Sequence, residues 1–327
     1  MRRLLVLSLA LLLLVGCSAN QLKQNPYTNP VYNHDAPDPT VIRASDGYFY
    51  AYTTESPYNG QTKLFPILKS RDMTTWTLVG QVFDQPPAWA SHDFWAPHIL
   101  YRGGKYYLYY AAKAKNGGTT AIGVAIADKP TGPFKDKGTP VIQGGGFSTI
   151  DPFVLVDGEK LYLYWGSDRV PILVQELTAD GLSVTGEPEP VLDPSLQFGG
   201  YESLVEGPWV IKRDPYYYLM YSGDDCCDQP HYAVLIARST SPLGPFEKDP
   251  ANPILVANDR WNGPGHNAAI QDDAGDWWLL YHAMDRKSAS KDRVMLLDKL
   301  TWQPDGWPVP MTPSTTQQPG PQWKKMR

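Results

Sequence analysis

The chain has 327 residues, of which 42% are hydrophobic and 19% charged, a balance typical of a globular protein with a sizeable core. Its formal net charge of -5, without a long basic run or an arginine-rich helix, argues against a nucleic-acid partner. Aromatic residues make up 12% of the chain, with 11 Trp and 20 Tyr. Flat rings stack on sugars, but they also fill β-rich cores, so composition leaves both roles open.

The N-terminal segment has the organisation of a secretory signal. Arg2 and Arg3 precede an apolar run, Leu4 to Val15, which is shorter than the roughly 20 residues that span a bilayer. The sequence Leu-Val-Gly-Cys at residues 14–17 resembles the bacterial lipobox, in which the Cys is lipidated. An ordinary signal peptide with a chance Cys is the alternative.

The lipobox divides the chain into three expected parts. These are a signal peptide at 1–16, a lipidated Cys17 with a flexible polar tether at 17–28, and one folded domain at 29–327. Ser18 after the Cys resembles the signal for sorting to the outer membrane. We therefore expect a chain anchored by lipid at the cell envelope, in the outer membrane, facing the periplasm or the cell surface.

Two of the 3 cysteines remain when Cys17 is set aside, and they are neighbours, Cys226 and Cys227. In an oxidising compartment such a pair can close a vicinal disulfide, which makes a rigid turn. Two free thiols are the alternative.

A turn followed by an aromatic-rich strand recurs five times along the chain. The spacings between successive turns are 57, 54, 57 and 60 residues, with the markers Gly47, Gly104, Gly158, Pro215 and Gly275. A short apolar strand precedes each turn, so each unit opens with a β-hairpin. Further strands are expected at 121–127 and 233–237, and no long stretch has helical periodicity. Five repeats of about four strands predict an all-β fold, a five-bladed β-propeller, rather than a β-sandwich.

Acidic and imidazole side chains stand just before the opening strands of four of the five units. The five positions are Asp38-Pro39, Trp95-Ala96-Pro97, Asp151-Pro152, Glu206-Gly207-Pro208 and Gly265-His266-Asn267. The innermost strand of each blade lines the central channel of a propeller, so equivalent positions converge on one axis. The repeat therefore predicts two aspartates, a glutamate and a histidine in one pocket.

Carboxylates gathered in a channel suit the hydrolysis of a glycosidic bond. A protonated carboxyl group donates a proton to the leaving oxygen, while an ionised one activates water. Mutual repulsion raises the pKa of at least one member, which helps to supply the acid.

These motifs, together with Asp93-Phe94-Trp95, resemble the ordered motifs of glycoside hydrolase family 43 over roughly residues 29–310. The resemblance implies a propeller catalytic domain, inversion at the anomeric carbon, and no cofactor for the chemistry. It further implies Asp38 as general base, Asp151 as pKa modulator and Glu206 as general acid. His266 resembles the family histidine near the channel axis, which implies either help in holding a structural calcium ion through water or a hydrogen-bonded channel residue.

The sequence departs from the family pattern before the base. The family often has His there, whereas Pro37 precedes Asp38, and His34-Asp35 lies three residues earlier. Asp35 is therefore a rival base, although it lacks the following Pro and apolar strand. A carboxyl separation of about 6.5–9.5 Å would favour inversion, and one near 5 Å retention.

The expected partner is an oligo- or polysaccharide, and the membrane is contacted only through the lipid anchor of a monomer. The Cys226-Cys227 pair and the 277–283 stretch resemble arabinan-acting members of the family. We expect Asp93 and His266 to contact substrate, and the stacking candidates are Trp89, Phe94, Trp95 and Trp165. The alternatives are a xyloside- or galactan-acting hydrolase, and a glycan-binding propeller without catalysis, against which the three carboxylates argue.

Overall fold

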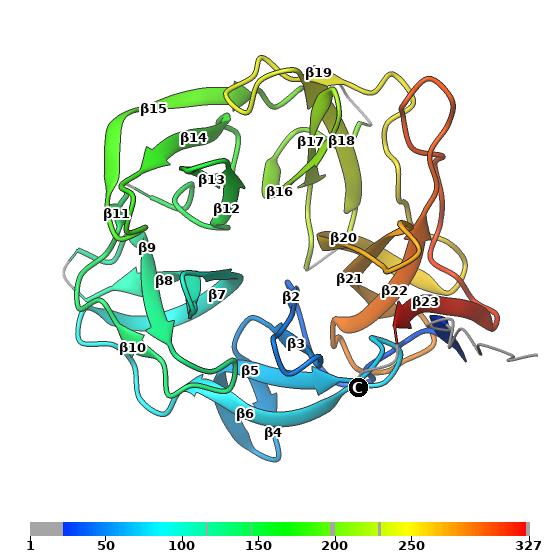
Figure 1. Ribbon diagram of the computed structural model, residues 1–327, viewed down its shortest axis with the longest axis horizontal. Helices are drawn as coiled ribbons and strands as arrows, with labels where there is room; N and C mark the ends of the chain where they lie inside the picture. The colour runs from blue at the N-terminus through cyan, green and yellow to red at the C-terminus, as the bar shows by residue number, and fades with distance from the viewer. Residues whose placement is uncertain (1–21, 116, 145, 197–199, 228–229, 325–327) are drawn as a thin grey trace, which may run out of the picture.

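The computed structural model describes residues 22–115, 117–144, 146–196, 200–227 and 230–324. Throughout these ranges the elements are strands joined by turns and loops, with no helix that is long and apolar enough to cross a membrane. Five antiparallel sheets surround a central axis, and the expected five-bladed propeller is confirmed (Figure 1).

Within a blade the strands follow one another outwards from the axis, mostly in chain order. The first blade contains β2 (Thr40–Arg43), β3 (Phe49–Tyr52), β4 (Ser56–Tyr58), β5 (Gln61–Ser70) and β6 (Thr77–Phe83). The second contains β7 (Ala90–Arg102), β8 (Lys105–Ala114), β9 (Thr120–Ala127), β10 (Lys135–Asp136) and β11 (Ile142–Gln143). The third contains β12 (Phe153–Asp157), β13 (Lys160–Trp165), β14 (Ile172–Leu177) and β15 (Val184–Leu192). The fourth contains β16 (Val205–Arg213), β17 (Tyr216–Gly223), β18 (Ala233–Ser239) and β19 (Glu247–Lys248), and the fifth β20 (Trp261–Gln271), β21 (Trp277–Asp285) and β22 (Val294–Leu300).

The hairpin that opens each blade places one strand at the axis. The innermost strands are β2, β7, β12, β16 and β20, and each contacts the innermost strands of the two neighbouring blades. Turns such as Asp157-Gly158-Glu159, in which Gly158 has a φ of 63°, return the chain into the second strand. The start of every innermost strand therefore points to the same end of the channel.

The second strands account for much of the aromatic content. Several of their tyrosines are buried between blades, and some of these donate a hydroxyl hydrogen bond to a backbone carbonyl of another segment. The Tyr52 hydroxyl donates to Pro130 O at 2.6 Å, that of Tyr109 to Gly181 O at 2.8 Å, and that of Tyr218 to Gly306 O at 2.7 Å. Burial of a ring with its polar end satisfied stabilises the contact between blades. Many of these aromatic residues therefore serve the core.

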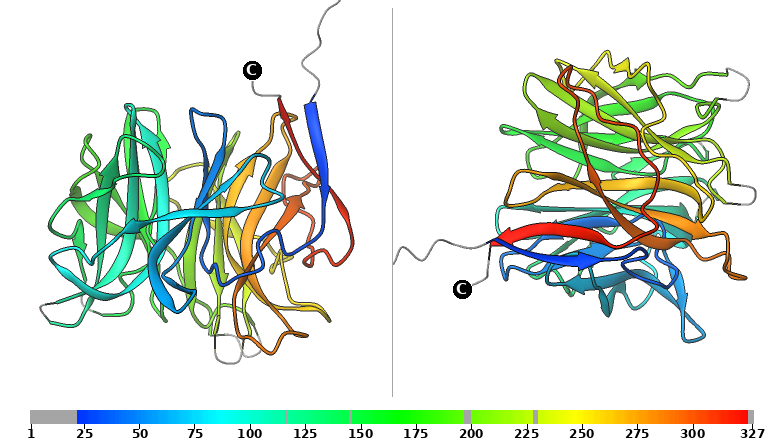
Figure 2. Two further views of the ribbon diagram at one scale, coloured as in Figure 1. Left: turned by 90° about the horizontal axis from the view of Figure 1, so that it is seen from below. Right: turned by 90° about the vertical axis from the view of Figure 1, so that its right-hand side faces the viewer.

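The expected tether is wrong over its last part, because residues 22–27 form a strand. This strand, β1 (Leu22–Tyr27), pairs antiparallel with β23 (Gln318–Lys324), and the two lie side by side along the ring (Figure 2). Its composition is polar because most of its side chains are exposed. The strand forms because its backbone pairs with β23 near the other end of the chain, and the local composition of residues 22–27 cannot show such a pairing. The expected signal peptide and Cys17 lie outside the described residues.

Candidate active site

A left-handed backbone residue stands at the equivalent place of every blade, just before β2 and β12 and at an irregularity within β7, β16 and β20. These residues are Asp38, Ala96, Asp151, Gly207 and His266, with φ values of 54°, 46°, 60°, 59° and 48°. A positive φ costs a non-glycine residue roughly 1–3 kcal/mol and is typical of functional sites. The repeat therefore brings Asp38, Asp151 and His266 to equivalent places, whereas Glu206 stands one residue earlier in its blade.

The Asp38 carboxylate is buried among cationic and hydrogen-bonding groups. Its Oδ1 lies 3.1 Å from Arg293 Nη1, and its Oδ2 accepts a hydrogen bond from Thr54 Oγ1 at 2.6 Å. Burial acts to raise the pKa of Asp38, but the Arg293 guanidinium and the imidazoles of His266 and His282 outweigh it, so that the pKa lies well below its usual range. Asp38 is therefore ionised, as a base must be.

Glu206 and Asp151 form the opposite half of the site. Glu206 Oε2 accepts from Ser167 Oγ at 2.6 Å, and Oε1 accepts from the Tyr232 hydroxyl at 2.7 Å. Burial raises the pKa of Glu206, while these two hydrogen bonds act to lower it. Burial together with the charges of Glu206 and Asp38 raises the pKa of Asp151 well above its ordinary value. A proton is therefore held on this side of the site, as a general acid requires.

The half of the site that contains Glu206 and Asp151 depends on close contacts with the backbone of neighbouring strands. Asp151 Oδ2 accepts the Gly207 N–H at 2.9 Å, which ties two neighbouring blades together at the axis. A Cβ at Gly265 would lie 2.1 Å from the Tyr232 ring, so only glycine lets that ring reach Glu206.

Two histidines lie beside Asp38. His266 Nδ1 is 3.5 Å from Asp38 Oδ1 and 3.7 Å from Asp151 Oδ2. Burial lowers the pKa of His282 to about 4, so this imidazole is neutral, and its Nδ1 accepts the Asp38 N–H at 3.1 Å. Calcium prefers six to eight oxygen ligands. Within the described ranges no group of three or more His, Cys, Asp or Glu side chains could hold a metal ion directly, and the calcium expected beside His266 through water stays a prediction.

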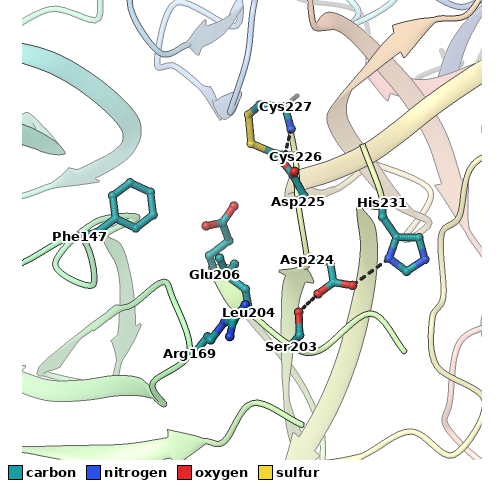
Figure 3. Close-up of a pocket in the computed structure, with 10 residues that line it drawn as sticks. All are labelled: Phe147, Arg169, Ser203, Leu204, Glu206, Asp224, Asp225, Cys226, Cys227 and His231. Atoms are coloured by element: carbon teal, nitrogen blue, oxygen red, sulfur yellow. Dashed lines mark hydrogen bonds and ion pairs between the residues drawn. A yellow bond between two sulfur atoms is a disulfide. The ribbon is translucent and has the colours of Figure 1, made fainter. Parts of the chain in front are cut away.

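Glu206 faces a cavity of about 580 Å³ (Figure 3). The side chain lies between Phe147 on one side and the disulfide that joins Cys226 to Cys227 on the other. The loop that carries the disulfide is fixed by Asp224, whose carboxylate contacts His231 Nδ1 at 2.8 Å. The expected cysteine pair thus forms a wall of the cavity beside Glu206.

The expected stacking residues occupy different environments. Phe94 is 1% exposed and packs against Phe65, and Trp165 is 4% exposed in the core between the second and third blades. Neither ring offers a free face to a sugar, so the expected stacking role of these two residues is wrong. The side chains of a strand alternate between its two faces, but the sequence does not show which face is solvated. Trp95 is half-buried beside Phe147, at 6.2 Å between ring centroids, and its role in stacking on a sugar stays a prediction.

The remaining expected contacts lie at the rim. Asp93 is half-buried, and its Oδ1 lies 2.9 Å from His92 Nδ1. Trp89 is half-buried and stacks on Tyr110 at 5.8 Å between centroids. Asp35 Oδ1 accepts the Arg293 N–H at 3.0 Å, so it helps to hold the residue that contacts Asp38.

Four residues of the site were missed by sequence reasoning: Thr54, Tyr232, His282 and Arg293. A positional signal exists for two of them. Tyr232 and Arg293 each stand immediately before the third strand of their blade, β18 and β22. Third strands run in the same direction as the innermost ones, so their starts also lie at the catalytic end of the channel.

The arrangement has the groups that glycosidic hydrolysis needs. Asp38 is an ionised carboxylate, and Glu206 is a carboxyl group with a raised pKa that faces an open cavity. Asp151 lies close enough to both for their charges to raise its own pKa. An ionised base and a protonated acid in one pocket can activate water and protonate a leaving oxygen.

Comparison with known proteins agrees with this geometry. Residues 27–308 match the family described as Glycosyl hydrolases family 43. The chain is 29% identical to the extracellular endo-α-(1→5)-L-arabinanase 1 of Bacillus subtilis (strain 168), over 83% of this chain and 86% of that protein. It is 27% identical to the extracellular exo-α-(1→5)-L-arabinofuranosidase ArbA of Cellvibrio japonicus (strain Ueda107), over 84% and 86% of the two chains.

A solved structure gives the same result. The crystal structure of a thermostable family-43 glycoside hydrolase superposes with a TM-score of 0.78 at 30% identity and covers 90% of this chain and 99% of that one. The match of fold, carboxylates and sequence over most of the chain leads to one conclusion: the chain belongs to glycosyl hydrolases family 43 and is a glycoside hydrolase.

Proposed function

We propose that this chain hydrolyses α-L-arabinofuranosidic bonds in arabinan or arabino-oligosaccharides with inversion at the anomeric carbon. The observation that carries the proposal is the opposite perturbation of two carboxyl groups in one pocket. The pKa of Asp38 lies well below the ordinary value of an aspartate, whereas the pKa of Glu206 lies above the ordinary value of a glutamate. Asp38 then takes a proton from water, and Glu206 gives one to the leaving oxygen.

Asp151 tunes this pair rather than reacting with the sugar. Its Oδ2 is occupied by the Gly207 N–H, and its carboxyl group is 5% exposed. Burial and the nearby charges of Glu206 and Asp38 raise the pKa of Asp151, so a proton is held beside Glu206 and is available for the leaving group. Trp95, Asp93 and His266 are the proposed substrate contacts.

The choice of arabinan rests on the relatives and on the wall of the cavity. An endo-acting arabinanase and an exo-acting arabinofuranosidase are both similar to the chain over most of its length. Arabinofuranosyl units are compact five-membered rings, and the space between Phe147 and the disulfide offers apolar surface on both sides of Glu206.

Hydrolysis by wild type and Glu206→Gln tests the proposal. Wild type should cleave linear arabinan and an aryl α-L-arabinofuranoside faster than aryl xylosides or galactosides, and NMR should show inverted configuration in the first product. Glu206→Gln should lose at least roughly a hundredfold in kcat on arabinan, because it removes the proton donor. The matched control, Glu176→Gln, alters a partly exposed residue paired with Lys160 at 2.8 Å and should keep full activity.

Three results would contradict the proposal. Equal inertness of wild type and Glu206→Gln on every substrate would favour a glycan-binding propeller. Faster cleavage of xylosides than of arabinofuranosides would show that the substrate is a xyloside and not an arabinan. A first product with retained configuration would exclude the inverting mechanism.

We further propose that Cys17 carries a lipid that anchors the enzyme, as a monomer, to the outer membrane. The lipobox at residues 14–17 supports this location. Metabolic labelling of Cys17 with a fatty acid and membrane fractionation test it, with Cys17→Ser as the variant that should lose both label and membrane association.

A further inference from the structure

The described chain begins on the side of the propeller opposite the catalytic residues. Leu22 pairs with Lys324, and the Lys324 N–H donates to Asp273 Oδ2 at 2.6 Å. The same carboxylate oxygen lies 2.9 Å from Arg43 Nη1. Arg43 ends the innermost strand that Asp38 precedes, and the five residue steps between them span about 16 Å of extended chain. The N-terminal strand therefore starts near the face opposite the active site.

Cationic side chains gather at this place. A cavity of about 320 Å³ is lined by Lys23, Arg43, Arg71 and Lys324, with Asp72 as its one acidic residue. We call these four residues the cationic face. Asp72 is already engaged, because its Oδ1 accepts hydrogen bonds from the Thr74 N–H and hydroxyl at 3.0 and 2.9 Å.

Most of this charge is available to a partner. Lys23, Arg71 and Lys324 are exposed and form no ion pair within the part of the chain that the structure describes. Arg43 is held in place by Asp273 and by the ring of Trp323, at 5.1 Å from its centroid. The four cations of the cationic face therefore outnumber the two carboxylates beside them, Asp72 and Asp273.

We propose that the cationic face contacts the anionic lipid headgroups of the membrane to which Cys17 is anchored, so that the active site opens away from the bilayer. The inference rests on the proposed lipidation of Cys17 and adds an orientation to it. Four residues lie between Cys17 and Leu22, so the five steps from one to the other span at most about 18 Å. The strand β1 is thus held close to the bilayer, and its neighbouring cations lie where headgroup charge is felt.

The orientation has a consequence for a polymeric substrate. A chain whose active site faced the lipid would exclude arabinan from the cavity beside Glu206. With the cationic face on the lipid, the depth of the propeller separates the membrane from the cavity, and the polysaccharide reaches Glu206 from the aqueous side.

Lysine labelling on vesicles tests the orientation without use of enzyme activity. The chain from Cys17 onward is coupled through the Cys17 thiol to a maleimide lipid, since Cys226 and Cys227 are joined to each other. Vesicles contain phosphatidylcholine alone or mixed with phosphatidylglycerol. A water-soluble acetylating reagent then reports the exposure of each lysine by mass spectrometry.

Acetylation of Lys23 and Lys324 should be slowed roughly fivefold or more on the anionic vesicles relative to the neutral ones. Lys291 lies before β22 on the catalytic side, and its labelling should be unchanged. Equal labelling of Lys23 and Lys324 on both kinds of vesicle, or protection of Lys291 in their place, would overturn the proposal.

A pair of charge variants provides the second arm. Lys23→Gln with Arg71→Gln should abolish the protection of Lys324, whereas the matched control, Lys105→Gln with Lys135→Gln in the second blade, should retain it. Protection that survives in the first variant, or is lost in the second, would refute a role for the cationic face. Arabinan hydrolysis by the free chain and acylation of Cys17 in cells are measured separately, so failure of those proposals is distinguishable.

Discussion

Replacing Arg293 by Met tests whether the guanidinium keeps Asp38 ionised. Arg293 Nη1 lies 3.1 Å from Asp38 Oδ1, and both side chains are largely buried. Asp38 must be ionised to act as base, so activity falls as the pH drops through its pKa. Removal of the positive charge raises the pKa of Asp38, and the acid limb of kcat/KM must therefore move to higher pH.

The size of this shift follows from the geometry. Unit charges 3.1 Å apart interact by about 5 kcal/mol at an effective dielectric constant near 20. His266 still favours the ionised carboxylate, so the expected rise is about one to three pKa units, or roughly 1.4–4 kcal/mol. Arg293 also acts to lower the pKa of Glu206, as a weaker influence, so the alkaline limb should move in the same direction by less.

The assay is kcat/KM against pH on arabinan, for wild type, Arg293→Met and Arg293→Lys. The lysine variant keeps the charge and should restore much of the wild-type acid limb. Arg43→Met is the matched control, because Arg43 pairs with Asp273 at 2.9 Å on the opposite face. If folded Arg293→Met had the same acid limb of kcat/KM against pH as wild type, the reasoning that Asp38 is the base and that Arg293 keeps it ionised would be refuted.

The other predictions concern the acid side of the site. Tyr232→Phe removes a hydrogen bond that favours the ionised form of Glu206, so its pKa rises and the alkaline limb of the pH profile should move to higher pH; an unmoved limb would contradict this role. Gly265→Ala places a Cβ 2.1 Å from the Tyr232 ring, so kcat should fall by roughly a hundredfold and Tm by several degrees. Gly80→Ala, where nothing lies within 4 Å of the added Cβ, should change neither value, and equal losses in both variants would count against the argument.

The fivefold repeat made the fold and three carboxylates predictable. Each opening hairpin depends on local signals, a turn between apolar and aromatic strands, which a single sequence displays. Asp38 and Asp151 occupy the same left-handed position before the innermost strand, so one local rule finds both. Glu206 departs from that rule by one residue, and only the neighbouring Gly207-Pro208 marks its place.

The partners of these carboxylates were harder to predict because they come from other strands. Tyr232 and Arg293 precede third strands, where the second and third blades carry Thr119 and Pro171, so the repeat does not mark those positions as functional. His282 lies within the second strand β21, among residues that serve the core. Sequence shows which residues share a position in the repeat, but not which long side chains meet across the channel.

The pairing of β1 with β23 joins residues from opposite ends of the chain, such as Gln24 and Gly320, which are 296 positions apart. Contacts between such distant residues close a very long loop, and the entropy cost of closing it opposes their early formation. Trp323 packs on Phe49 of the first blade at 4.5 Å between ring centroids. During synthesis, the Phe49 ring is therefore not covered by Trp323 until the last residues have been made. Loss of the final ten residues would leave that ring uncovered and β1 unpaired, so this short C-terminal segment governs whether the newly made chain closes or aggregates.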